Sequence, residues 1–368
     1  MQDPKFGNRI LERGKVYLVY DELGSLIMRR EWGRVAGDGS ELNHFVRSIL
    51  KPQARPLKLL FVFHGGLGDA VSLAALLVLL EREYNFQIDI ACRYEVWFYI
   101  LVPMGFRGKR LDFPLEMNEI GEYEYIQTDA TNFFTAREDG IWEESIIARL
   151  SEAYRVDVLE FRPEYSIPAE VMNIAALPGR ERIRIGLSFE SKGRVRAYPD
   201  ALANQVISLL LSFGFEVFHF GTGGEKESHH DRAYHCMLGR TGIFELAAFL
   251  RQMDFFISMD SFPAHLANVL GVKSLVLLST TGTRTYQFHR NIVCMASKID
   301  CAPCGEVMHL CPKGFEECKA FFHESISPEL IVSAAVSGCR DVFSSKLAGH
   351  AGEQASPFVP VQARAVLG

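Results

Sequence analysis

The sequence predicts an α/β protein built from two doubly wound halves that face each other across a cleft. Continuous apolar runs such as Phe255–Met259 alternate with stretches of helical spacing, which is typical of parallel strands that are buried on both faces and joined by helices. The alternation starts at Leu57, stops in a proline-containing linker and starts again at Ile183. With 368 residues, the chain has room for two such units.

The first half, residues 57–178, is expected to open with a strand, a glycine-rich turn and a helix. Residues 1–56 precede it as a small appendage, in which residues 15–30 resemble a β-hairpin. The expected elements of this half are strands at Leu59–Phe63, Gln87–Cys92 and Tyr125–Thr128, and helices at Ala70–Glu83, Glu95–Pro103 and Ile141–Tyr154.

The second half, residues 179–340, repeats the same alternation. Residues 341–368 have little hydrophobic pattern, so we expect a mobile tail there. The expected elements of the second half are strands at Ile183–Phe189, Glu216–Phe220, Phe255–Met259 and Ser274–Ser279, and helices at Ala201–Phe213, Phe244–Gln252 and up to Leu270.

Composition excludes some classes of protein. Hydrophobic residues make up 48% and charged residues 23%, as in ordinary globular proteins, and the net charge of −6 argues against a nucleic-acid partner. No apolar run approaches the roughly 20 residues that span a bilayer. The first residues lack the apolar segment of a signal peptide, so we expect a cytoplasmic protein, with contact to a membrane surface and oligomerisation left open.

Each half has one strand-to-helix turn with candidate site residues. The turn His64–Asp69 is rich in glycine, and Asp260 and Ser261 follow the strand Phe255–Met259. Backbone N–H groups at such turns face anions. Asp69 is either a negative charge that stabilises the start of a helix or a general base. In the second case the positive end of the helix would hold the pKa of Asp69 low. Asp260 or Ser261 is either a ligand of an anion or a cap of the helix.

Two loops of the second half also carry charge at strand ends. Lys192, Arg194 and Arg196 place three cations within five positions, which suits a diphosphate or a solvated basic loop. Glu225 ends a glycine-rich loop after a strand, where an acid binds ribose hydroxyls or is simply a loop charge.

Four cysteines lie within 18 residues, at Cys301, Cys304, Cys311 and Cys318. Four thiols opened by C-x2-C favour a tetrahedral structural site for zinc or iron, and the alternative is ordinary thiols.

Together these segments resemble the heptosyltransferases of glycosyltransferase family 9, over residues 57–340. The resemblance rests on Leu67-Gly68-Asp69, on Arg196-Ala197-Tyr198-Pro199, on Asp260–Ala267, and on the cysteine segment followed by Ile326-Ser327-Pro328-Glu329. Phe262 stands where the family has glycine.

The resemblance implies a GT-B fold and inverting transfer of a sugar, heptose above all, from an ADP-activated donor to a hydroxyl. It implies that no catalytic metal is required. In this scheme Asp69 is the general base. The implied donor-binding residues are Gly68, Lys192, Arg196, Glu225, Asp260, Ser261 and His265.

A closer group within that family is also suggested. The appendage and the cysteines resemble those of the autotransporter heptosyltransferases, which modify proteins and carry iron, whereas Asp260 and His265 follow the lipopolysaccharide enzymes. The acceptor is thus either the lipopolysaccharide core or a protein. Two alternatives are a catalytically silent relative that binds a nucleotide-sugar or a partner, and a dinucleotide oxidoreductase, for which the glycine fingerprint is incomplete.

Overall fold

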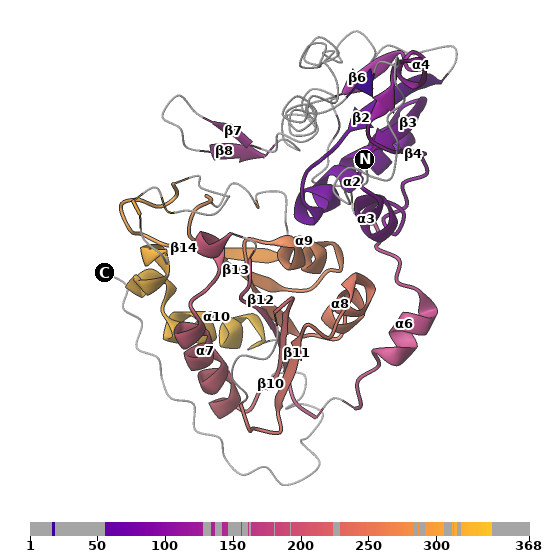
Figure 1. Ribbon diagram of the computed structural model, residues 1–368. Helices are drawn as coiled ribbons and strands as arrows, with labels where there is room; N and C mark the ends of the chain where they lie inside the picture. Colours follow the sequence, from indigo (N-terminus) through magenta and orange to yellow (C-terminus); the bar gives the residue numbers. More distant parts are fainter. Residues whose placement is uncertain are drawn as a thin grey trace.

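The computed structural model has two parallel sheets, each covered by helices (Figure 1). It describes residues 17–18, 56–127, 134–136, 142–145 and 156–340, the last with gaps at 157–160, 162, 180, 192, 224–228, 283–285, 287–290, 305–310, 312 and 315–317. The predicted tail and most of the predicted hairpin lie outside these residues.

The first sheet has the order β4-β3-β2-β6, and all of its pairs are parallel. Its strands are β2 (Leu57–Val62), β3 (Phe86–Ala91), β4 (Arg110–Leu111) and β6 (Tyr125–Gln127). The helix after β2, α2 (Leu67–Glu83), begins three residues earlier than predicted, so Asp69 lies in its first turn. The α/β prediction is confirmed for this half.

The predicted helix after β3 is also present. It comprises α3 (Tyr94–Val96) and a π-helical turn, η3 (Trp97–Leu101). The short helix α4 (Met117–Ile120) follows β5 (Leu115–Glu116). β5 pairs in antiparallel fashion with β1 (Tyr17–Leu18), the part of the appendage that is described.

One predicted helix is wrong. Within the predicted helix Ile141–Tyr154 the structure has a strand, β8 (Trp142–Ser145), paired in antiparallel fashion with β7 (Phe134–Ala136). The reason is that backbone pairing with a neighbouring strand overrides a helical spacing of apolar residues, which carries little free energy by itself.

The second sheet has six parallel strands in the order β11-β10-β9-β12-β13-β14. They are β9 (Arg184–Ser188), β10 (Glu216–Gly221), β11 (Tyr234–Leu238), β12 (Phe255–Met259), β13 (Ser274–Leu278) and β14 (Ile292–Ala296). Its helices are α7 (Asp200–Ser212), α8 (Ile243–Leu250), α9 (Phe262–Val269) and α10 (Pro328–Gly338), with 3-10 turns at Arg194–Arg196, Lys319–Phe322 and Glu324–Ile326.

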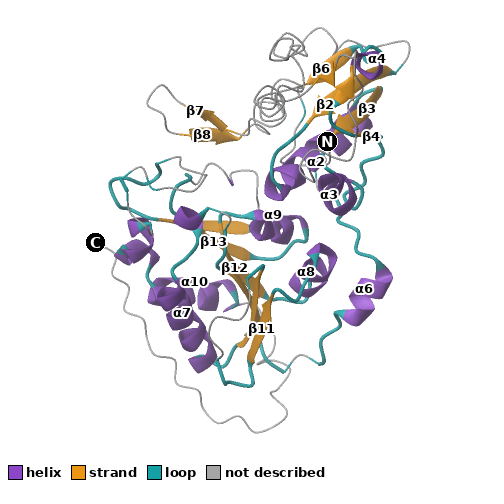
Figure 2. Cartoon of the chain, in the orientation of Figure 1, coloured by secondary structure: helices purple, strands orange, loops and turns teal. Residues whose placement is uncertain are grey.

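The helices of this half lie on both faces of the sheet (Figure 2). Because side chains alternate along each strand, they pack into two separate cores. Phe255 and Ile257 pack with α7 and α10 on one face, whereas Phe256 packs with α8 and α9 on the other. The core around Phe256 continues into α2, because α9 packs directly on α2. The two sheets are therefore joined through this helix pair.

The connection between the sheets is held by the end of α8. It contains the short helix α6 (Ala169–Ile174), and its Tyr165 is buried. Arg251 donates to the carbonyl of Tyr165 (2.6 Å). The side chain of Gln252 donates to the carbonyl of Ala175 and accepts from the N–H of Leu177, both at 2.9 Å. No helix in the described part of the chain has the length and apolar character to cross a membrane.

Candidate active site

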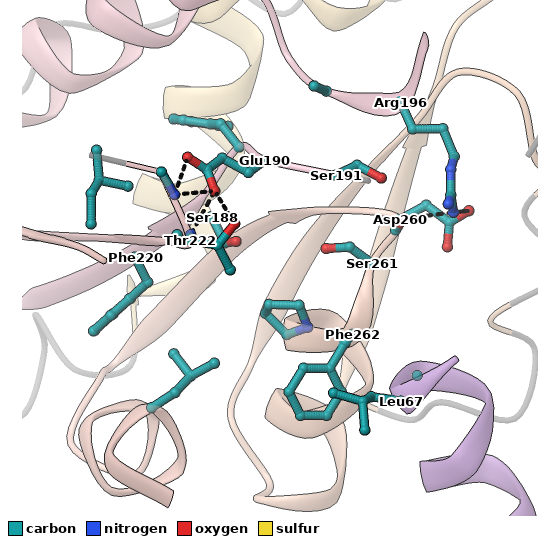
Figure 3. Close-up of a pocket in the computed structure, with 18 of the residues that line it drawn as sticks. Leu67, Ser188, Glu190, Ser191, Arg196, Phe220, Thr222, Asp260, Ser261 and Phe262 are labelled. Carbon is teal, nitrogen blue, oxygen red and sulfur yellow. Dashed lines mark hydrogen bonds and ion pairs between the residues drawn. The ribbon is translucent and has the colours of Figure 1, made fainter. Parts of the chain in front are cut away.

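One cavity of about 1210 Å³ is lined by the turns at the carboxyl ends of strands from both sheets (Figure 3). Both sheets are parallel, so these strand ends gather at one edge of each sheet, where open α/β sheets bind ligands. The first sheet contributes the turn before α2, with Asp69, and the start of α3. The second contributes residues after β9, the glycine loop after β10 and the start of α9, with Asp260.

Asp69 is held at the start of α2. The N–H of Gly66 donates to Asp69 Oδ2 (3.0 Å). Burial raises the pKa of Asp69 to about 6; the Gly66 hydrogen bond and the charge of Arg196 oppose this, and the charge of Asp260 adds to it. The expectation of a low pKa was wrong, because the cost of burying the charge exceeds the stabilisation from the helix start. Asp69 is a stronger base than an ordinary carboxylate.

Asp260 lies at the centre of a hydrogen-bonded network and is 7% exposed. Tyr286 donates its hydroxyl to Oδ1 (2.6 Å), and Thr281 donates to Oδ2 (2.8 Å). Arg196 Nη1 donates to the backbone carbonyl of Asp260 (3.1 Å) and forms an ion pair with Oδ2 (3.6 Å). Ser261 precedes α9 but does not cap it with its side chain, whose hydroxyl approaches the carbonyl of Met259 instead.

His265 packs between the two halves. Its ring stacks on Tyr286, with 5.0 Å between ring centroids. Burial lowers the pKa of His265 to about 4, so the ring is neutral at pH 7. A Cβ added at Gly68 would lie 2.7 Å from His265 Cδ2. Glycine is thus required at position 68 so that α2 can approach α9, a reason that differs from the anion binding for which it was singled out.

Three buried polar atoms of the cavity lining have no hydrogen-bond partner among the described residues. They are Arg196 Nε, Ser191 Oγ and Arg93 Nε. Buried polar atoms are usually satisfied, so such atoms mark places that a polar ligand would fill. Arg196 and Ser191 follow β9, close to where the sequence predicted binding of a diphosphate, whereas Arg93 precedes α3 of the first sheet. Lys192 and Glu225, the other predicted ligands of this region, lie outside the described residues.

Glu190 is a cavity residue that the sequence reasoning missed. It accepts hydrogen bonds from the glycine loop, including one from the Thr222 N–H at 2.6 Å (Figure 3). The available signal was an acid directly after a buried strand, the same signal by which Glu225 was selected. Tyr286 and Thr281 were missed as well, because their role depends on tertiary contact with Asp260.

Phe262 starts α9, and its ring lies beside Leu67 of α2 (Figure 3). Both side chains are partly buried and pack against the core that the halves share. The phenyl ring therefore lies toward the α2 side of the cavity and away from Glu190 and Thr222.

The four cysteines do not form the predicted metal site in this structure. Their thiols are all partly buried, and burial together with the nearby Cys304 and Cys301 raises the pKa of Cys318. Within the described residues, which include all four cysteines, no three His, Cys, Asp or Glu side chains come together as metal ligands. Cys311 is separated from its neighbours in the sequence by residues that are not described.

The fold and the cavity define a two-sheet α/β protein with its site between the sheets, the architecture of solved glycosyltransferases. An Escherichia coli ADP-heptose lipopolysaccharide heptosyltransferase II has 12% identity and a TM-score of 0.54, with 79% of this chain and 100% of that one aligned. A family 9 glycosyltransferase from Veillonella parvula has 13% identity and a TM-score of 0.58, with 78% and 99% aligned.

A third solved structure is the iron-containing dodecameric glycosyltransferase TibC from enterotoxigenic E. coli, with 14% identity, a TM-score of 0.53, and 81% of this chain and 78% of that one aligned. No curated protein sequence matches the chain. Residues 150–313 match the model of glycosyltransferase family 9 (heptosyltransferase). This match agrees with the family resemblance of the motifs, and the matched residues carry the Arg196 and Asp260 side of the cavity.

Proposed function

We propose that the protein transfers heptose from ADP-heptose to an acceptor hydroxyl, with inversion at the sugar carbon. The observation that carries this proposal is one cavity in which Asp69 of the first sheet faces Arg196 and Asp260 of the second. The family match supports it, as does the complex of TibC with ADP-D-β-D-heptose, a fold neighbour with a TM-score of 0.54.

In this proposal Asp69 removes the proton from the acceptor hydroxyl as the oxygen attacks the sugar carbon. Its carboxylate is accessible from the cavity, and its raised pKa brings it closer to neutral pH, where a general base is most effective. The bond from the sugar carbon to the phosphate oxygen breaks, and negative charge grows on the departing ADP.

Arg196 stabilises that charge. Its Nη1 is held by Asp260, while its Nε has no partner among the described residues, so the guanidinium is fixed in place with a donor to spare. Lys192 adds positive charge, and Ser191 Oγ offers a further hydrogen bond. A preorganised cation of this kind acts mainly on the transition state, where the diphosphate charge is greatest.

The donor sugar and phosphates are positioned by Asp260, Ser261 and His265. Gly68 allows α2 and α9, which carry the two walls of the cavity, to approach each other. Glu225 binds the ribose. The neutral His265 ring can donate or accept one hydrogen bond but adds no charge. The catalytically silent alternative relied on Phe262. In the structure this ring packs beside Leu67, and the family match does not favour the alternative.

Nucleotide binding and donor turnover test the proposal. ADP, UDP and GDP are titrated calorimetrically into the wild type, Arg196→Ala and Arg196→Lys, and ADP release from ADP-heptose is followed with candidate acceptors. We expect selective binding of ADP, weakened more than tenfold in Arg196→Ala and partly restored by lysine. Equal ADP affinity in wild type and Arg196→Ala, or no binding of ADP, would contradict the proposal.

The acceptor is a glycan of the lipopolysaccharide core or a protein, and the reaction takes place in the cytoplasm. Incubation with truncated lipopolysaccharide and with autotransporter passenger domains, followed by mass spectrometry, distinguishes the two acceptors. An increase equal to one heptose on only one of them identifies it. As TibC is dodecameric, we also propose an oligomer, which light scattering tests directly.

We further propose that Cys301, Cys304, Cys311 and Cys318 hold one structural zinc or iron ion. Four thiolates are a donor set that both metals accept, and the charges of Cys304 and Cys301 already act on the pKa of Cys318. Elemental analysis of protein purified without chelators should find about one metal per chain. Cys304→Ser should lose it and melt at a lower temperature, whereas Cys236→Ser should not; metal-free wild type would refute the proposal.

A further inference from the structure

An acidic side chain already occupies the glycine loop of the cavity. Glu190 Oε2 accepts hydrogen bonds from the N–H of Thr222 (2.6 Å) and from its hydroxyl (3.1 Å), and the N–H of Gly223 lies 3.1 Å from both carboxylate oxygens. Backbone N–H groups at such a loop are the donors that a phosphate would use. Here a carboxylate of the chain itself uses them.

The glycines of the loop are shaped around Glu190. A Cβ at Gly221 would lie 2.7 Å from Glu190 Cδ, and one at Gly223 would lie 2.5 Å from Oε1. Contacts this short would require the end of the Glu190 side chain to move, so glycine at both positions lets the loop close on the carboxylate as it does here. The loop therefore does not offer its N–H groups to the diphosphate of a donor.

The cation suited to a diphosphate lies at the other end of the same cavity. Figure 3 shows Glu190 and Thr222 on one side, Arg196 with Asp260 on the opposite side, and Ser191 between them. Arg196 Nε and Ser191 Oγ are buried and have no partner among the described residues. The guanidinium of Arg196 thus lies across the cavity from the carboxylate of Glu190.

We infer that Glu190 is a specificity residue, which orients the nucleotide by binding a ribose hydroxyl and excluding phosphate from the glycine loop. This inference rests on the proposed function. Oε1 takes part in one of these four contacts, whereas Oε2 takes part in three, and a carboxylate oxygen has two lone pairs. Oε1 therefore keeps an acceptor site in the cavity lining, which suits a hydroxyl and repels a phosphate.

Three nucleotides test this assignment by titration calorimetry: ADP, 2′-deoxy-ADP and ADP with a 2′-phosphate. Wild type should prefer ADP over 2′-deoxy-ADP by about tenfold, the scale of one hydrogen bond to a charged group, and should reject the 2′-phosphate. Glu190→Gln should reduce this preference. Glu190→Ala vacates the N–H groups of Thr222 and Gly223, so the 2′-phosphate form should bind at least tenfold more tightly than to wild type.

A gain in affinity for the 2′-phosphate nucleotide distinguishes a loss of specificity in Glu190→Ala from a loss of loop structure, because a disrupted loop would bind every nucleotide less well. Glu95→Gln, which neutralises a cavity carboxylate of the other sheet, should leave all the ratios unchanged. Glu225→Gln should weaken ADP without admitting the 2′-phosphate. Should the alanine variant be unstable, Glu190→Gln retains an acceptor for the loop and still reports the ADP preference.

The outcomes distinguish this inference from the function on which it rests. Wild type that binds no ADP contradicts the proposed function. Wild type that binds ADP, while Glu190→Gln keeps the full preference and Glu190→Ala gains no affinity for the 2′-phosphate form, overturns the role of Glu190 alone.

Discussion

Asp69 links the charge of a single side chain to the pH dependence of the whole reaction. Only the ionised carboxylate accepts a proton, and its pKa is raised to about 6. With ADP-heptose and the identified acceptor, kcat/KM should therefore fall about tenfold per pH unit below about 6. Asp69→Asn should lower kcat by two or more orders of magnitude and leave ADP affinity intact. If Asp69→Asn kept most of the wild-type activity, Asp69 would not be the general base and would only stabilise the start of α2.

The same side chain should reduce stability at neutral pH. Its pKa is higher in the folded chain than in the unfolded one, so its contribution to stability is complete below its ordinary pKa and is lost as the pH rises through about 6. At pH 7.5, Asp69→Asn should raise the melting temperature measured by calorimetry. At pH 3 this difference should largely disappear, and a lower melting temperature of the Asn variant at pH 7.5 would contradict the buried charge.

Tyr286 supports Asp260 through one short hydrogen bond (2.6 Å) and supports His265 through its ring. Tyr286→Phe removes only the hydroxyl. We expect it to destabilise the fold by about 1.5–3 kcal/mol, the scale of a hydrogen bond to a charged group, and to raise the KM for the donor. Urea denaturation and donor kinetics measure both. Tyr84→Phe, at a tyrosine remote from Asp260 that stacks on Phe86, is the control.

At the scale of elements, the contact between α2 and α9 requires the absence of one side chain. Gly68→Ala would place a Cβ 2.7 Å from the His265 ring. Overpacking of this kind costs about 1–3 kcal/mol, and it should also displace Asp69 from the second sheet and lower kcat. Gly179→Ala, where an added Cβ meets no atom within 4 Å, should change neither the stability nor the rate.

The elements that the sequence predicted best are those buried on both faces. The central strands β9, β12 and β13 are buried at every position, and β12 and β13 are apolar except for one serine each, so their patterns are strong. The edge strands β11 and β14 were missed, and most of their residues are only partly buried. β11 mixes polar with apolar residues, whereas the apolar run of β14 was left unassigned. The helix predicted over 141–154 failed for a related reason, since strand pairing is a tertiary effect.

The candidate site divides in a similar way. Asp69, Arg196, Asp260 and His265 were selectable because each lies in a local motif, and all of them line one cavity. Their electrostatics were not predictable, because burial rather than the adjacent helix sets the pKa of Asp69. Tyr286 acts through a partner 26 residues away, which no local pattern reveals. Glu190 carries the local signal of an acid after a buried strand, but its partner Thr222, 32 residues away, is set by the fold.

At the scale of the molecule, the connection between the sheets depends on Gln252, whose side chain satisfies the carbonyl of Ala175 and the N–H of Leu177. Gln252→Leu leaves both groups without these partners at similar volume. We expect a loss of about 1–3 kcal/mol for each buried group left unpaired, and unfolding of the two halves at separate temperatures. Differential scanning calorimetry detects this as a second transition. Gln252→Glu keeps an acceptor for the N–H of Leu177, so its loss of stability should lie between that of the wild type and that of Gln252→Leu. A single transition of Gln252→Leu at the wild-type temperature would contradict the role of Gln252 in holding the connection.

The ion pair between Arg196 and Asp260 has a consequence for how the reaction ends. In the proposed reaction Asp260 holds Arg196 throughout, with 3.6 Å between Oδ2 and Nη1, so part of the positive charge that ADP would meet is already neutralised. The carboxylate thus competes with the product for the charge of Arg196, and we expect it to shorten the time that ADP stays bound. Asp260→Asn removes this competitor, so stopped-flow measurement should show slower ADP dissociation, whereas faster dissociation would exclude the competition. A residue selected for holding the donor would then also set the rate at which the enzyme is emptied for its next turnover.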